Sequence, residues 1–141
     1  MEVVVHEDEI KSCLRARTLV HAGVTSCLTV TAILQNEIVG LHVVQFSADE
    51  VAYPQRLVLL MQRFNQRIHG RVIDALYIVA PLAFFPPDYE DEVQQMVINA
   101  PVATLIDITD SSEKGNDIYF IGSARVVQVQ VGGRIVVRQQ W

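Results

Sequence analysis

The fold is decided by two apolar, β-branched runs, LTVTAIL at residues 28–34 and IVGLHVVQF at residues 38–46, which the polar segment Gln35-Asn36-Glu37 separates. Runs of this composition are typical of strands, and the polar segment is typical of a hairpin turn. If Gln35 and Asn36 form a two-residue loop, every facing pair is fixed and His42 lies opposite Thr29. The sequence therefore predicts a β-hairpin of known register.

The hairpin brings a cysteine and a histidine together. Cys27 immediately precedes the first run and follows HAGVTS at residues 21–26, which predicts a tight glycine-containing turn. Cys27 and Thr29 share one side of the sheet because side chains alternate with period two. His42 is then a diagonal neighbour of Cys27, at roughly 7–8 Å between backbones. A slip of one residue would put the two groups on opposite faces.

This pair has the residue types of a thiol hydrolase. A free thiol is mostly protonated near neutral pH, and a neighbouring imidazole can hold it as a reactive thiolate. The same imidazole can then protonate a leaving amine. The alternative interpretation is structural: Cys27 is a small buried hydrophobic residue, and His42 is a strand residue with a satisfied hydrogen bond.

Length and composition narrow the class of protein. A chain of 141 residues predicts a single domain over residues 1–141. The net charge of −5 argues against a nucleic-acid-binding surface, which would need a basic stripe. Two cysteines, Cys13 and Cys27, predict reduced thiols rather than a secreted disulfide scaffold. The start lacks a basic segment of a secretory signal, and no apolar stretch is long enough to span a bilayer. We therefore expect a soluble, cytoplasmic protein without membrane insertion.

The remaining pattern predicts an α+β layered domain with a mixed, largely antiparallel β-sheet and two main helices. A long helix begins between Ser47 and Pro54 and ends at Gly70, and Asp88 caps a second helix. Gly132-Gly133 predicts a hairpin. A short helix or a loop is expected over 7–17, and strands are expected over 1–5, 75–85, 103–108, 118–121, 125–131 and 134–138. The buried stripe of the long helix comprises Leu57, Leu60, Met61, Phe64 and Ile68.

Parts of the chain resemble the CheD family of chemoreceptor glutamine deamidases. GVTSCLTV at residues 23–30 is similar to the family's Gly-Leu-Gly-Ser-Cys turn, and IVGLH at 38–42 is similar to its Gly-Gly-Met-Ala-His strand. The order of elements after the hairpin, and the ending GRIVVR at 133–138, are also similar. The motif match covers about fifteen positions.

The resemblance implies a cysteine hydrolase that deamidates glutamine side chains of a protein substrate without a cofactor. Cys27 would attack the carboxamide carbon, His42 would transfer protons, and backbone N–H groups near Ser26 and Cys27 would stabilise the oxyanion.

The sequence departs from the family at the third catalytic position. His21 stands where the family has a threonine, six residues before the cysteine. The distantly similar cytotoxic necrotizing factor toxins orient their histidine with a backbone carbonyl, so the resemblance allows a site without that threonine. Thr29, opposite His42, is a local substitute for it.

Two alternatives stay open on the same fold. His21, Cys27 and His42 would form a Cys-His-His metal site if they cluster, although no paired-ligand spacing supports one. A catalytically inactive binding domain would instead act through a protein partner. Homo-oligomer formation is left open by the sequence.

Overall fold

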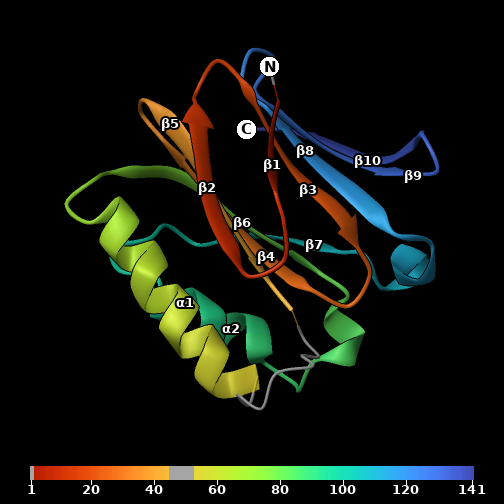
Figure 1. The fold of residues 1–141 in the computed structure, drawn as a ribbon, viewed down its shortest axis with the longest axis horizontal. Coiled ribbons are helices and arrows are strands. Elements are labelled where there is room, and N and C mark those ends of the chain that lie inside the picture. Colours follow the sequence, from red (N-terminus) through yellow and green to blue (C-terminus); the bar gives the residue numbers. More distant parts are fainter. Residues whose placement is uncertain (1, 45–52) are drawn as a thin grey trace.

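The computed structural model describes residues 2–44 and 53–141, which form three layers: two five-stranded sheets face each other, and the helices cover one of them (Figure 1). The inner sheet, beside the helices, has the order β2-β5-β4-β6-β7 and the outer sheet has the order β1-β3-β8-β9-β10. The predicted α+β layered architecture is confirmed, and its strands divide between two sheets.

The inner sheet contains β2 (Glu9–Leu14), β5 (Glu37–Val43), β4 (Leu28–Leu34), β6 (Ile73–Ala80) and β7 (Thr104–Asp107). The outer sheet contains β1 (Glu2–Val5), β3 (Thr18–Val24), β8 (Asn116–Ile121), β9 (Val126–Val131) and β10 (Arg134–Gln140). The helices are α1 (Tyr53–Ile68) and α2 (Tyr89–Met96), with short 3-10 helices η1 (Leu82–Phe84) and η2 (Thr109–Lys114).

The predicted hairpin is present with the predicted register. In the β4–β5 ladder, Thr29 faces His42 and Ile33 faces Ile38, as a two-residue loop at Gln35 and Asn36 requires. Every residue of β4 is buried, because β4 lies between β5 and β6 and both of its faces are covered. Alternation therefore sends Val30 toward the helices and Ile33 toward the outer sheet.

The long helix docks through the predicted stripe. The five stripe residues, from Leu57 to Ile68, all lie in the core between the helices and the inner sheet. The helix ends at Ile68, and Gly70 follows with a positive φ of 72°. The expected capping box at Ser47–Glu50 lies outside the described residues.

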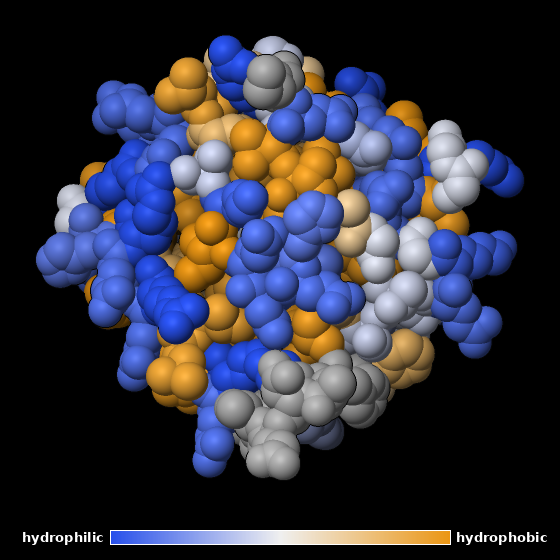
Figure 2. Space-filling model, in the orientation of Figure 1, coloured by the Kyte–Doolittle hydropathy of each residue, from blue (hydrophilic) through white to orange (hydrophobic). Residues whose placement is uncertain are grey.

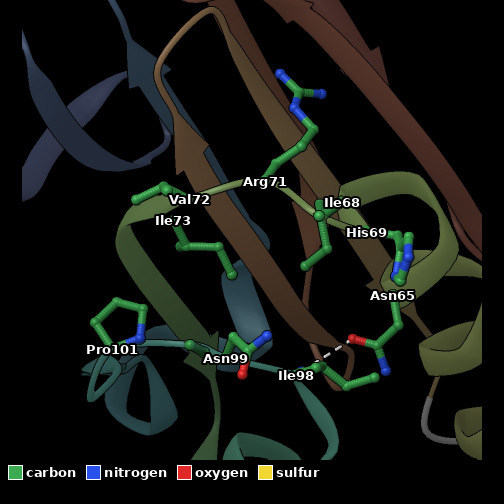
Figure 3. A pocket seen from close by; sticks show the side chains of 11 residues that line it. Asn65, Ile68, His69, Arg71, Val72, Ile73, Ile98, Asn99 and Pro101 are labelled. Carbon is green, nitrogen blue, oxygen red and sulfur yellow. Dashed lines mark hydrogen bonds between the residues drawn. The ribbon is translucent and has the colours of Figure 1, made fainter.

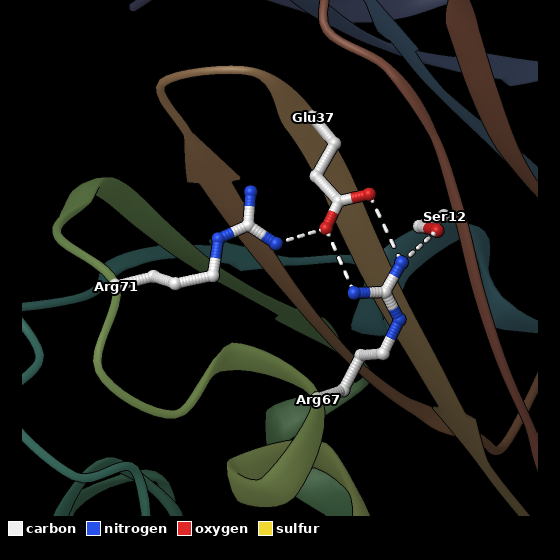
Figure 4. A network of polar contacts seen from close by, with 4 residues as sticks. All are labelled: Ser12, Glu37, Arg67 and Arg71. Carbon is white, nitrogen blue, oxygen red and sulfur yellow. Dashed lines mark hydrogen bonds and ion pairs between the residues drawn. The ribbon is translucent and has the colours of Figure 1, made fainter.

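Polar contacts also tie α1 to the inner sheet. Arg67 donates to both carboxylate oxygens of Glu37, at 2.8 and 3.0 Å, and to the hydroxyl of Ser12 at 2.6 Å (Figure 4). Arg71 donates to the same carboxylate. At the other end of α1, Arg56 is buried and pairs with Asp8 at 3.5 Å.

The main differences from the sequence expectation concern β2, β3, the end of β6 and the start of α2. The segment expected as a short helix or loop contains strand β2, whose charged residues lie on a half-exposed sheet edge. The turn expected from His21 is a continuation of strand β3 as far as Val24. The strand expected to reach residue 85 ends at Ala80, because Pro81 follows and η1 begins. Asp88 occupies the N-cap of α2, but with a left-handed φ of 62° and no side-chain capping bond.

The surface mixes polar and apolar side chains. Figure 2 shows hydrophilic side chains interleaved with smaller apolar areas over the face seen in Figure 1. Val72, Val102 and Leu105 are among the exposed apolar residues. In residues 2–44 and 53–141, no helix has the length and apolarity needed to cross a membrane.

Candidate active site

Cys27 lies between the two sheets at the end of a short bend. The bend at Thr25 and Ser26 connects β3 of the outer sheet to β4 of the inner sheet. Cys27 is only 4% exposed and belongs to the apolar cluster that the two sheets enclose. Its neighbour Leu28 belongs to the core on the helix side. In the same register, Cys27 would face Val44, one position beyond the last ladder pair, Leu28 and Val43.

His42 lies on the face of the hairpin that the sequence predicts. Its register partner is Thr29, and its side chain is buried between the sheets at 1% exposure. His42 is therefore a diagonal neighbour of Cys27, the residue that follows the bend.

A backbone carbonyl orients the His42 ring. The ring Nδ1 lies 3.3 Å from the carbonyl oxygen of Val5, at the end of β1. A carbonyl only accepts, so Nδ1 carries the proton and Nε2 carries the lone pair. Nε2 has no hydrogen-bond partner within residues 2–44 and 53–141. The ring therefore presents a basic nitrogen rather than a donor.

Burial keeps His42 neutral. Its pKa lies below the ordinary value of 6.5, chiefly because burial disfavours the charged imidazolium. The carbonyl of Val5 and the charges of Glu7 and Asp8 act in the opposite direction and limit the decrease in its pKa. A neutral imidazole near pH 7 is the form that a general base requires.

His21 reaches across from the outer sheet onto the inner sheet. Its Nε2 lies 2.8 Å from the hydroxyl oxygen of Thr31, and both side chains are fully buried. The ring sits against Gly40, which faces Thr31 in the β4–β5 register. Its centroid lies 5.8 Å from that of His42, in an edge-on arrangement. Burial, with a smaller contribution from His42, lowers the pKa of His21 well below 6.5.

The structure brings the two histidines together without a hydrogen bond between them. His21 is bound to Thr31, and His42 is bound to the Val5 carbonyl. Thr29 donates its hydroxyl to the carbonyl of Val79 at 2.9 Å, so this hydroxyl proton is not directed at His42. The Val5 carbonyl takes the place that was expected for Thr29 as the group that orients the ring.

The metal alternative has no support in the described part of the chain. Within residues 2–44 and 53–141, no three His, Cys, Asp or Glu side chains are grouped as ligands of a metal ion. His21, Cys27 and His42 are thus not arranged as a metal centre.

Two groups of this site, the Val5 carbonyl and Thr31, were not predicted from the sequence. The Val5 contribution is a backbone oxygen, which no side-chain pattern reveals. Thr31 could have been found from the hairpin register, which pairs it with Gly40. Gly40 has no side chain, so it leaves room beside Thr31 for a ring from the other sheet.

A cavity of 680 Å³ lies away from these residues, where the end of α1 meets the loop after α2. Ile68 and Ile73 point into it, whereas Arg71 points away toward Glu37 (Figure 3). Asn65 closes one side by accepting from the backbone N–H of Ile98 at 3.2 Å. None of the histidine or cysteine residues between the sheets lines this cavity.

No protein-family model matches the sequence, and no curated protein is significantly similar to it.

Proposed function

We propose that this protein is a cysteine-dependent amidohydrolase in which Cys27 is the nucleophile and His42 is the base. The observation that carries the proposal is the contact of His42 Nδ1 with the Val5 carbonyl. This contact leaves Nε2 as an unprotonated nitrogen on the side of the hairpin that Cys27 occupies. In the proposed mechanism the order of groups is thiol, imidazole and orienting acceptor, which is the logic of an activated nucleophile. Nε2 of His42 makes no hydrogen bond to Cys27 in the described residues, so the mechanism requires the thiol and Nε2 to come into contact when substrate binds.

The reaction follows from these groups. Nε2 of His42 takes the thiol proton, and the Cys27 sulfur adds to a carboxamide carbon. Backbone N–H groups of Ser26 and Cys27 stabilise the resulting oxyanion. When the tetrahedral adduct collapses, the carbon–nitrogen bond breaks, His42 protonates the departing ammonia, and a thioester remains. Water, deprotonated by His42, then cleaves the thioester, releasing a carboxylate and restoring the thiol.

The proposed substrate is a glutamine side chain of a protein, which the reaction converts to glutamate. The support is the similarity of residues 23–30 and 38–42 to the CheD turn and strand, which would make this chain a divergent relative of that family. His21 then marks a difference from the family, because it packs on Gly40 and binds Thr31 instead of orienting His42.

Ammonia release tests this proposal. Casein and a panel of bacterial chemoreceptor fragments would be incubated with the protein, and conversion of glutamine to glutamate would be mapped by peptide mass spectrometry. We expect deamidation that Cys27→Ser and His42→Ala abolish and that Cys13→Ser retains. Ammonia release that is equal in the wild type and Cys27→Ser, or absent from both, would contradict a deamidase.

A second candidate function is a binding domain that uses the same fold without catalysis. The low exposure of Cys27 and His42 favours it, because a buried thiol and a neutral buried imidazole also make an ordinary core. The two functions differ in the reactivity of Cys27, which a catalytic pair raises and a structural core suppresses.

A further inference from the structure

Strand β3 changes register just before the bend that leads to Cys27. His21 pairs with Ile118, whereas Val24 pairs with Asn116, so one extra residue is accommodated in β3 between these two pairs. Gly23 lies in this bulge with a positive φ of 64°. Bulges of this kind redirect a strand and are common beside active sites.

Two consecutive residues at the start of β8 hold the bulge. The carboxylate of Asp117 accepts from the backbone N–H of Gly23 at 2.8 Å. The side-chain amide of Asn116 donates to the carbonyl of Val24 at 3.0 Å and to the carbonyl of Ser111 at 3.1 Å. The hydroxyl of Ser111 donates back to the Asn116 oxygen at 2.7 Å.

The Asn116 side chain is completely buried and uses both of its functional atoms. It therefore locks the peptide plane that follows Val24 to the helical turn η2. Only Thr25 and Ser26 separate Val24 from Cys27, so the position of this plane determines where the thiol and the backbone N–H groups of the bend point.

We propose that Asn116 is a positioning residue for Cys27, a role that rests on the function proposed above. It touches neither the thiol nor the expected substrate, and it acts by fixing the backbone from which Cys27 projects. A carboxylate cannot replace it, because a donor is required toward two carbonyl oxygens. Asn116→Asp would place negative charge against both oxygens while it keeps the acceptor for Ser111.

The test measures the alkylation rate of Cys27 by iodoacetamide with peptide mass spectrometry. The reaction is run at about pH 6.5, below the ordinary thiol pKa of about 8.5, so that only an activated thiol reacts quickly. Alkylation of Cys13, which is buried elsewhere between the sheets, reports unfolding in the same sample. Asn65→Asp is the matched control, because Asn65 donates to the Met96 carbonyl and accepts from Ile98 N–H far from the bend.

We expect Asn116→Asp to lower the Cys27 rate by about tenfold, since small displacements of a reacting group cost one to two orders of magnitude. Ser111→Ala, a milder change that removes one bond to Asn116, should lower the rate less, and Asn65→Asp should leave it unchanged. Wild-type rates in both Asn116→Asp and Ser111→Ala, or an equal decrease in Asn65→Asp, would overturn the positioning role. If Asn116→Asp does not fold, Ser111→Ala decides the matter.

The two proposals fail differently. A wild-type Cys27 that reacts like Cys13 and does not depend on His42 contradicts the catalytic pair itself, and with it the role of Asn116. A fast, His42-dependent Cys27 that ignores Asn116→Asp and Ser111→Ala contradicts only the positioning role.

Discussion

Two buried histidines from different sheets meet at the candidate site, His21 from the outer sheet and His42 from the inner sheet. One nitrogen of each ring has a hydrogen-bond partner. The partner of His21 is the hydroxyl of Thr31, and the partner of His42 is the backbone carbonyl of Val5. Both rings have a lowered pKa because burial disfavours the charged form. Two properties of this site can therefore be tested: the packing of His21 against Gly40, and the neutral state of both rings.

Replacing Gly40 should displace His21. A Cβ at this position would lie 2.8 Å from Leu19 Cδ2 and 3.0 Å from His21 Cε1 and Nε2, which is too close for either side chain to remain in place. We expect Gly40→Ala to lower the free energy of unfolding by about 1–3 kcal/mol in urea denaturation. In the double variant with His21→Ala, the added methyl group should cost less. Additive effects of the two changes would contradict this packing.

The histidines should also make stability depend on pH. The folded pKa of His21 and of His42 lies below 6.5, so the unfolded chain binds more protons. Their contribution is complete above about pH 6.5 and is lost as the pH falls from there toward the lowered folded values. Each additional proton bound on unfolding gives a slope of about 1.4 kcal/mol per pH unit. Urea denaturation at several pH values measures this slope, and His21→Leu should reduce it. An unchanged slope in His21→Leu would show that other groups cause it.

At the scale of elements, the β4–β5 hairpin is the part that sequence predicts best. The two-residue loop fixes the facing of Thr29 and His42, and the structure has this pair. The neighbouring β3 is predicted less well, because its glycine indicates a turn, whereas Gly23 occupies a bulge within a strand. Strand β2 escapes prediction because EIKSCL, at a half-exposed sheet edge, lacks the apolar content of a core strand.

The bulge in β3 offers a comparison between two glycines. Gly23 and Gly133 have φ values of 64° and 79°, and a Cβ on either would meet nothing within 4 Å. Alanine at each position should therefore cost about 1–2 kcal/mol of stability from backbone strain alone. Only Gly23→Ala should also slow alkylation of Cys27, because only Gly23 lies next to its bend. Equal reactivity of Cys27 in both variants would show that the bulge does not position the thiol.

At the scale of the whole molecule, the sequence indicates layers but not how many sheets they contain. The candidate site depends on this arrangement, because His21 and Val5 belong to the outer sheet while Thr31 and His42 belong to the inner sheet. Contacts between sheets depend on how the two sheets pack together, and no local periodicity encodes this packing. The diagonal relation of Cys27 and His42 is predictable because both belong to one hairpin, whereas the Val5 carbonyl that contacts the His42 ring comes from β1 of the other sheet.

The pH dependence of Cys27 alkylation tests the proposed pair most directly, with Cys13 as internal control and His42→Ala as the comparison. Activation by His42 predicts a Cys27 rate that persists well below the ordinary thiol pKa of about 8.5 and that His42→Ala abolishes. A Cys27 that titrates as an ordinary thiol, or that is unreactive until the protein unfolds, would contradict an activated pair and leave a non-catalytic binding domain as the better interpretation.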